Sequence, residues 1–180
     1  MTVSRKVILY LAISLDGYIA RKDHNLDWLL KFNTSNEDYG YSQFIKDVDT
    51  VIMGRKTYDE VVKMGYEYPH GDKQYFIMTH SEKPVKKNLL FYTGDLIDLV
   101  TELKNKPGLN IYVDGGMVVN ELMKHHLIDE YIISVVPILL GDGIRLFNDG
   151  RQEEYLTLKE CKRFESGMAQ LHYIKSDFEK

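Results

Sequence analysis

The segment DTVIMGRKTYDEV, residues 49–61, combines the features that decide the fold. An apolar run at 51–53 predicts a buried strand, which stops at Gly54 and gives way to a helical pattern. A helix that begins directly after a strand presents unpaired amide groups and a partial positive charge, and a glycine there lets backbone approach a ligand closely. The first residues of this helix add two cations and a hydroxyl: Arg55, Lys56 and Thr57. Phosphate binding and an exposed basic turn both explain the segment, although its spacing is not that of a Walker loop.

A second junction of strand, glycine and helix lies in VDGGMVVNEL, residues 113–122. Gly115 and Gly116 can bring main chain against a pyrophosphate, although the third glycine of the Rossmann fingerprint is missing. Taken alone, the pair is better explained by a tight turn that requires a positive φ. Two such junctions in one small α/β domain could instead hold the two ends of one dinucleotide.

Polar residues also follow the strand predicted within FIMTHSEK, residues 76–83. Thr79, His80 and Ser81 form a cluster of small hydrogen-bonding groups and an imidazole. Ligands of open α/β sheets bind beyond the carboxyl ends of parallel strands. The cluster therefore either meets a ribose or a 2′-phosphate, or it is an ordinary polar loop.

Three carboxylates are candidates for catalysis. Asp16 follows the first predicted strand in an Asp-Gly turn signal, and it either forms that turn or lies in the cleft beside a reactive ring. Glu37 and Asp38 lie near the start of a predicted helix, where Ser35 and Asp38 match a capping box. Capping explains these carboxylates, and a carboxylate there could also hydrogen-bond the amino and imino groups of a heterocycle.

The bulk composition narrows the function classes. A length of 180 residues favours one domain, 1–180, and a formal charge of −4 argues against a general nucleic-acid binder. The single cysteine, Cys161, fits a cytoplasmic protein, and we expect it in the core of a tail strand rather than as a nucleophile. No metal-site motif occurs. The N-terminal apolar run is interpreted as a first strand rather than a targeting segment, and no apolar run is long enough to span a bilayer.

Strands and helices alternate along the chain, and a pair of strands ends it. This order predicts a three-layer α/β/α fold around a mixed sheet, with a C-terminal antiparallel hairpin that turns at Ser166–Gly167. The expected strands are 5–15, 49–53, 74–79, 88–93, 110–115, 129–139, 155–166 and 169–177. The expected helices are 35–47, 55–63, 95–105 and 117–127.

In this order the segments resemble the dihydrofolate reductase-like superfamily over nearly the whole chain. VIMGRKTYDEV resembles the Met-Gly-Arg-x-Thr motif that leads into the helix holding the NADPH phosphates, and LDWL resembles the Leu-Pro-Trp of a mobile loop. VDGGMVVNEL resembles the Gly-Gly segment of that enzyme. SLDGYIA and PILLGDGIRLF resemble the reductase domain of bifunctional riboflavin biosynthesis proteins and its small stand-alone bacterial relatives.

The resemblance implies NADPH as the cofactor and gives roles to individual residues. By resemblance, the cofactor's phosphates are held by Gly54, Arg55, Lys56 and Thr57, and the adenosine ribose with its 2′-phosphate lies near Thr79, His80 and Ser81. The pyrophosphate and nicotinamide side is carried by Gly115, Gly116, Met117 and Val118. The nicotinamide ring is contacted by Ala12 and Ile19. Counting back from the Met-Gly-Arg motif places the catalytic acid of dihydrofolate reductase at Asp38, but counting forward from Trp28 places it at Asn33. The intervening segment is longer here, which speaks against true dihydrofolate reductase activity.

The resulting prediction is an NADPH-dependent reductase that transfers hydride to a small, flat, pterin- or pyrimidine-like heterocycle or a related carbonyl. Asp16 and Asp38, with Glu37 behind them, are expected to orient the substrate or supply a proton. Trp28 is expected to close over the site, and Tyr41 to stack on the substrate or pack in the core. Two alternatives remain, an NADP(H)-binding protein without efficient catalysis and a structural homodimer joined by the tail hairpin. The resemblance alone implies a homodimer.

Overall fold

The computed structural model describes residues 5–32, 37–65, 71–81, 84 and 86–176. Its strands are β1 Val7–Ser14, β2 Tyr18–Ala20, β3 Val48–Gly54, β4 Gln74–Met78, β5 Leu89–Tyr92, β6 Asn110–Asp114, β7 Glu130–Val136, β8 Ile144–Arg145, β9 Leu156–Arg163 and β10 Ala169–Lys175. Its helices are α1 Asp27–Leu30, α2 Tyr41–Phe44, the 3-10 helix η1 Ile45–Asp47, α3 Arg55–Lys63, α4 Leu96–Lys104 and α5 Gly116–Lys124. None of these helices is long and apolar enough to cross a membrane.

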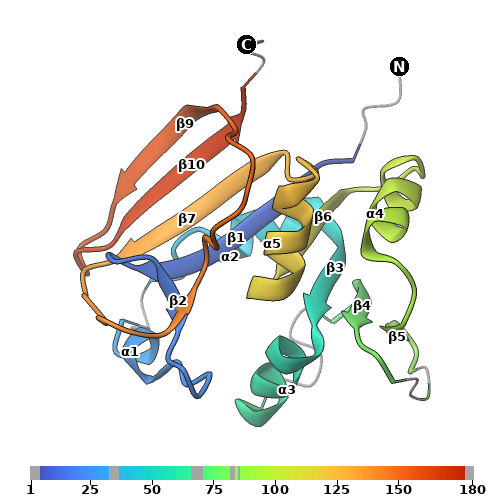
Figure 1. The fold of residues 1–180 in the computed structure, drawn as a ribbon, viewed down its shortest axis with the longest axis horizontal. Helices are drawn as coiled ribbons and strands as arrows, with labels where there is room; N and C mark the ends of the chain where they lie inside the picture. The colour runs from blue at the N-terminus through green and yellow to red at the C-terminus, as the bar shows by residue number, and fades with distance from the viewer. Residues whose placement is uncertain (1–4, 33–36, 66–70, 82–83, 85, 177–180) are drawn as a thin grey trace.

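An eight-stranded mixed sheet in the order β5-β4-β3-β6-β1-β7-β10-β9 forms the centre of the molecule (Figure 1). The strands from β5 to β7 are parallel, and β10 and β9 complete the sheet in antiparallel fashion. A second, small antiparallel sheet pairs β2 with β8. The predicted mixed sheet with a C-terminal hairpin is therefore confirmed.

Helices cover both faces of the central strands, which explains their continuous apolar sequences. In Figure 1, α4 and α5 lie in front of the sheet and α2 lies behind it. The larger core cluster joins α4 and α5 to one sheet face, and a second cluster joins α2, η1 and α3 to the other. Val51 and Ile52 point to opposite faces, and both are 0 % exposed. Parallel strands buried on both sides require such unbroken apolar runs.

The helix predicted over 35–47 is wrong for residues 37–40. Tyr39 and Gly40 have positive φ angles of 56° and 87°, which a right-handed helix excludes. The helix begins only at Tyr41, after the side chain of Asp38 accepts hydrogen bonds from the amides of Gly40 and Ser42. Asn33 and Ser35 lie outside the described residues.

Other differences concern the edges of the fold. The last parallel strand ends at Val136, because Pro137 has no amide hydrogen to continue a ladder. The expected core position of Cys161 is also wrong: its strand, β9, is exposed along its whole length. Trp28 lies in α1 rather than on an open loop, and its side chain is completely buried.

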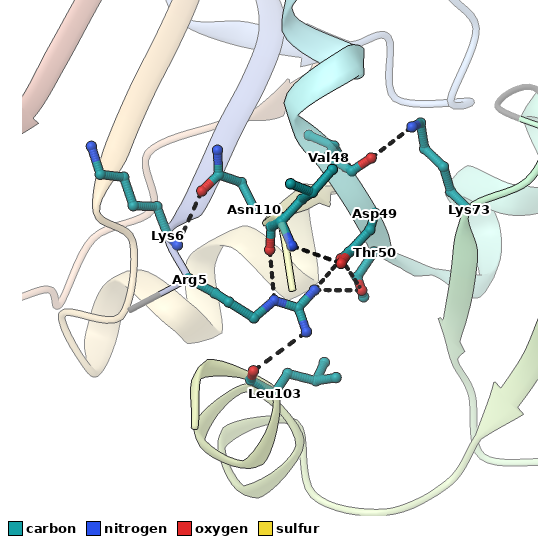
Figure 2. Close-up of polar contacts among 9 residues, drawn as sticks. Arg5, Lys6, Val48, Asp49, Thr50, Lys73, Leu103 and Asn110 are labelled. Carbon is teal, nitrogen blue, oxygen red and sulfur yellow. Dashed lines mark hydrogen bonds and ion pairs between the residues drawn. The ribbon is translucent and has the colours of Figure 1, made fainter. Parts of the chain in front are cut away.

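A buried arginine closes the amino-terminal ends of the strands (Figure 2). Arg5 is 6 % exposed, and its guanidinium donates to the carboxylate of Asp49, to Thr50 Oγ1 at 2.7 Å and to the carbonyl oxygen of Leu109 at 2.6 Å. The other oxygen of Asp49 accepts from the amide of Leu109 at 2.8 Å. These bonds tie the residues before β1 to β3 and to the turn that precedes β6.

Replacing Arg5 with methionine should lower the free energy of unfolding by about 2–4 kcal/mol, because Asp49 and the surrounding acceptors lose a buried donor. Urea unfolding measures the change. The matched control is Lys106→Ala, which removes an exposed pair with Glu102 and should change stability by less than about 0.5 kcal/mol. Equal losses in the two variants would show that Arg5 does not hold the strand ends together.

Candidate active site

The two glycine-led helix starts meet at one edge of the sheet. They follow the neighbouring parallel strands β3 and β6, so α3 and α5 begin side by side. Gly115 has a φ of 88°, and an added Cβ would collide with Thr57 Oγ1 and lie 3.4 Å from the amide nitrogen of Gly54. Gly115 is thus required both by its backbone conformation and by the close packing of the two junctions.

Both helix starts lack the side chains that normally satisfy such positions. Neither Gly54 before α3 nor Gly115 before α5 offers a side-chain acceptor, and neither first turn carries an acidic residue. By contrast, Asp95 before α4 accepts hydrogen bonds from the amides of Ile97 and Asp98. Unpaired amides at two adjacent helix starts form a positive edge that suits a phosphorylated ligand.

Gly54 tests how well a nucleotide phosphate would fit there. Its φ is −73°, which any residue adopts, and an added Cβ would meet only Val118 Cγ2, at an ordinary 3.9 Å. Neither backbone strain nor the described neighbours therefore require glycine at this position. A ligand that reaches the first amides of α3 would require a residue without a side chain at position 54. Glycine at this position therefore fits a bound phosphate.

The polar cluster after β4 lies beside this edge, because β4 is the next strand after β3. The amide of Thr79 donates to the carbonyl of Tyr92, and Thr79 Oγ1 accepts from the amide of Ser81 at 3.2 Å. His80 between them is exposed. The turn leaves an imidazole and hydroxyls at the edge of the sheet, next to the start of α3.

Two cations on α3 point in different directions. Arg55 Nε donates to Asp59 Oδ1 at 2.7 Å, and its guanidinium lies 5.4 Å from the centre of the Phe91 ring. Arg55 is therefore fixed toward β5. Lys56 is exposed, and its Nζ lies 3.4 Å from His24 Nε2 in the turn after β2.

The start of α5 and the end of β1 form the other half of the edge. An added Cβ on Gly116 would lie 2.9 Å from Ile19 Cδ1, so the segment after β1 packs directly on this helix start. Met117 is 77 % exposed, whereas Val118 is buried in the core. The predicted cofactor residues span β4, β3, β6 and β1, three strand spacings or about 14 Å.

Asp16 is held as an ionised carboxylate by three donors. Ser14 Oγ donates to it at 2.6 Å, and the amides of Leu140 and Gly141 donate at 3.1 and 2.7 Å. Partial desolvation opposes ionisation, but these hydrogen bonds outweigh it and lower the pKa of Asp16 from 3.8 to about 2. Asp16 thus joins the end of β1 to the segment after β7, and it is a poor proton donor at neutral pH.

Glu37 and Asp38 are also engaged by neighbouring backbone. Glu37 Oε1 accepts from the amide of Tyr39 at 2.9 Å. Hydrogen bonds from Ser42, and then from the amide of Gly40, lower the pKa of Asp38. Both carboxylates contribute to the electrostatic environment of Tyr10, whose pKa burial raises to about 12. Both carboxylates therefore lie near the sheet and accept hydrogen bonds from backbone amides of the turn before α2 and of its first residues.

Asp114 is the carboxylate that the sequence-based prediction missed. It ends β6 directly before the two glycines, and it accepts from the amide of Gly115 at 2.7 Å and from Tyr112 Oη at 3.2 Å. Desolvation raises the pKa of Asp114 more than these hydrogen bonds lower it. Its place after a strand and before a glycine pair was the available signal, but the desolvation of its carboxyl group is not readable from the sequence.

Aromatic rings line the sheet beside Asp114. Tyr112 contacts Phe44 edge to face, with 5.3 Å between ring centres, and Phe44 stacks on Tyr10 at 4.6 Å. Tyr41 lies edge to face with Tyr10 at 5.5 Å. These rings come from β6, α2 and β1, and Tyr41 is therefore part of an aromatic cluster with Tyr10, Phe44 and Tyr112.

Trp28 belongs to a third cluster, with Val136 and Met168, against which Ala12 packs. Its indole Nε1 is buried and has no hydrogen-bond partner among the described residues. Trp28 is thus part of the apolar cluster against which Ala12 packs. Within the same described ranges, no group of three His, Cys, Asp or Glu side chains could hold a metal ion.

The fold is that of dihydrofolate reductase-like proteins. The structure of dihydrofolate reductase from Enterococcus faecalis, complexed with NADP(H) and RAB-propyl, matches with a TM-score of 0.66 over 97 % of this chain and 100 % of that one. At 14 % identity this likeness shows the fold alone.

The model of the RibD C-terminal domain family matches residues 5–170, and the chain belongs to this family. The uncharacterized protein YwjB of Bacillus subtilis (strain 168) is 40 % identical over 176 residues, which cover 97 % of this chain and 100 % of YwjB. The crystal structure of a putative riboflavin biosynthesis protein from Shewanella sp. PV-4 is 31 % identical, with a TM-score of 0.86 over 95 % of this chain and 99 % of that one.

The lowered pKa of Asp16 predicts a pH-dependent contribution to stability. A depressed pKa in the folded state stabilises the protein above the ordinary value of 3.8, and this contribution disappears as the pH falls toward 2. Asp16→Asn should therefore be less stable than the wild type at neutral pH, and the two unfolding free energies should converge between pH 3.8 and 2. Denaturant unfolding across this range measures the difference, and a constant difference would contradict the assignment.

Proposed function

We propose that this protein is an NADPH-dependent reductase whose acceptor is a small, flat, pyrimidine- or pterin-like heterocycle. The observation that carries the proposal is the pair of adjacent helix starts, α3 and α5, which have neither a side-chain cap nor an acidic residue in the first turn. Membership of the RibD C-terminal domain family and the reductase fold support it.

The cofactor phosphates would be held by the first amides of α3 and α5, with the hydroxyl of Thr57 between the two junctions. Arg55 is oriented by Asp59 and Phe91 toward the side of β4, where Thr79, His80 and Ser81 would meet the ribose and its 2′-phosphate. Lys56 adds positive charge at the surface. Ala12, Ile19, Gly116, Met117 and Val118 would shape the nicotinamide end. A bound NADPH supplies hydride from the nicotinamide ring.

Reduction of the acceptor needs a proton in addition to the hydride, and the proposed proton donor is Asp114. A carboxyl group with a raised pKa keeps its proton closer to neutral pH, whereas the lowered pKa values of Asp16 and Asp38 favour their ionised forms. When the pKa values of neighbouring carboxyl groups are shifted in opposite directions, the group with the raised pKa suits proton donation and the ionised groups suit orientation of the substrate or the protein. Asp114 would hold the proton beside the acceptor, while Asp16 would fix the segment after β7, and Asp38 with Glu37 the start of α2.

The aromatic residues near Asp114 support a planar acceptor. The half-buried Tyr10, Tyr41 and Phe44 carry aromatic rings on the sheet face that carries Asp114, and the buried Tyr112 packs against Phe44. Such a wall suits a planar ring, and the carboxyl group suits its polar edge. Family membership and the likeness to a putative riboflavin biosynthesis protein favour a pyrimidine over a pterin.

Gly54→Ala tests the phosphate-binding edge. The added methyl group fits the protein, with its nearest neighbour at 3.9 Å, but it would cover the first amides of α3. The thermal midpoint should stay unchanged, and the dissociation constant for NADPH should rise about tenfold or more, as expected for loss of a charge-assisted hydrogen bond. Isothermal titration calorimetry measures the affinity.

Lys63→Ala, at the far end of α3, is the matched control and should bind NADPH like the wild type. Absence of saturable NADPH binding by the wild type would refute the proposed function. Unchanged affinity in Gly54→Ala would instead refute the position of the phosphates. Saturable binding without oxidation by any pyrimidine or pterin would favour the non-catalytic NADP(H)-binding protein.

Asp114→Asn tests the proton donor. The variant should bind NADPH normally, and its turnover with a reducible pyrimidine should fall by about a hundredfold or more. Wild-type turnover should decrease as the pH rises through the raised pKa of Asp114, because the donor loses its proton. NADPH oxidation followed by absorbance measures both effects. A loss of turnover in Asp38→Asn, with Asp114→Asn unaffected, would assign the proton to Asp38 instead.

A further inference from the structure

Tyr39, in the turn before α2, has a strained backbone. Its φ is 56°, in the left-handed region that residues with large side chains rarely adopt. Such a conformation persists only where the surrounding structure holds it, and strained residues of this kind gather at functional sites. The contacts of Tyr39 therefore identify the groups that fix the turn at residues 37–40.

The amide, the hydroxyl and the ring of Tyr39 each have a partner. The amide donates to Glu37 Oε1 at 2.9 Å, and the hydroxyl donates to the carbonyl oxygen of Phe32 at 2.5 Å. The ring meets that of Phe164 edge to face, with 4.9 Å between ring centres. These contacts come from connecting segments, whereas the carbonyl group of Tyr39 is held by the sheet.

Two side chains of the sheet donate to the carbonyl oxygen of Tyr39. They are Tyr10 Oη on β1, at 2.8 Å, and Gln170 Nε2 on β10, at 3.0 Å. Burial raises the pKa of Tyr10 to about 12, so its hydroxyl keeps the proton that it donates. Gln170 is 6 % exposed, and its Nε2 also lies 3.0 Å from Ser134 Oγ on β7, the strand between β1 and β10. Three adjacent strands thus hold one carbonyl group of the turn.

The two donors lie beside the proposed reaction site. Gln170 lies opposite Ser134, and Ser134 lies opposite Ala12, so these residues form one row across the sheet. Two strand spacings, about 10 Å, separate Gln170 from Ala12, which would contact the nicotinamide. Tyr10 and Asp114 each follow the last paired residues of β1 and β6, so Tyr10 is the neighbour of the proposed proton donor.

The turn that the two donors hold leads into the aromatic residues of the proposed acceptor site. The Asp38 carboxylate ties the turn to α2, because it accepts from the amide before the helix and from an amide of its first turn. α2 supplies the rings of Tyr41 and Phe44, whose centres lie 5.5 and 4.6 Å from the centre of the Tyr10 ring. A shift of the Tyr39 carbonyl would therefore displace both rings of α2.

We propose that the hydroxyl of Tyr10 and the amide of Gln170 are positioning groups for the acceptor, which act by holding the carbonyl group of Tyr39. This role rests on the proposed function and adds to it: the rings on which a planar acceptor would pack are fixed from the sheet, because α2 itself has only four residues. A displacement of about 1 Å from the productive geometry can cost about a hundredfold in rate, so two hydrogen bonds on one turn can decide turnover.

Tyr10→Phe tests this role, because it removes one donor and keeps the ring. The value of kcat/KM for a reducible pyrimidine should fall about tenfold or more, with the larger part of the fall in kcat. The dissociation constant for NADPH should stay within about twofold, because the helix starts that would bind the cofactor are unchanged. Gln170→Met, which keeps the length of the side chain and lacks its amide, should give the same result. NADPH oxidation followed by absorbance and isothermal titration calorimetry measure the two quantities.

Tyr131→Phe is the matched control, because it also removes a tyrosine hydroxyl that donates, here to Glu154 Oε2 at 2.9 Å, away from the proposed site. It should keep the wild-type kinetic constants. Amide hydrogen exchange of the free protein measures the turn without reference to the reductase activity. The amides of Gly40 and Ser42 should exchange roughly tenfold faster in Tyr10→Phe, as expected for loss of one hydrogen bond, and at the wild-type rate in Tyr131→Phe.

The possible outcomes separate the positioning role from the proposed function. A wild type that neither binds NADPH nor reduces any acceptor would refute both. Wild-type turnover that persists unchanged in Tyr10→Phe would refute the positioning role alone, and so would an equal loss in Tyr131→Phe. Faster exchange without loss of turnover would make the bonds merely structural, and loss of turnover without faster exchange would exclude a route through Tyr39. If Gln170→Met fails to fold, Tyr10→Phe decides by itself.

Discussion

The packing of Gly115 against Thr57 is the constraint on which the rest of the candidate site depends. A side chain at position 115 would collide with the threonine hydroxyl and would also require a strained φ of 88°. Because this contact joins the junction after β6 to the junction after β3, two separate helix starts form one continuous edge. A parallel sheet brings such junctions near one another, and the glycine allows their backbones to lie closer than a side chain at position 115 would permit.

The carboxyl groups around this edge have pKa values that are shifted in different directions, because their environments differ. Asp16 accepts from two backbone amides and a hydroxyl, and Asp38 from Ser42 and the amide of Gly40, so both have lowered pKa values. Asp114 has fewer donors for its degree of desolvation, and its pKa is raised. The difference comes from the number of donors relative to burial rather than from sequence position. This division supports Asp114 as the proton donor and the other two as groups that fix loops.

The sequence predicted the parts of this structure that rest on local patterns. The apolar run at 51–53 and the glycine pair at 115–116 predicted both strand–helix junctions, because parallel strands buried on both faces need unbroken apolar runs. The turn at residues 37–40 was missed because the Asp38 carboxylate accepts hydrogen bonds from the amides of Gly40 and Ser42, and these bonds compete with a helix there. The exposure of Cys161 and the desolvation of Asp114 depend on what covers each strand, and that is a tertiary property that no local pattern contains.

The two ends of the sheet differ in how their polar groups are satisfied. At the amino-terminal ends, Arg5 satisfies carboxylate, hydroxyl and carbonyl acceptors in a buried cluster. At the carboxyl-terminal ends, α3 and α5 begin without side-chain caps, and glycine in place of a capping residue costs roughly a few tenths of a kcal/mol at each start. Residues that would cap these helices would also occupy the amides that a phosphate needs. The proposed phosphate site would therefore require uncapped helix starts at this end of the sheet, whereas the polar groups around Arg5 at the opposite end are paired.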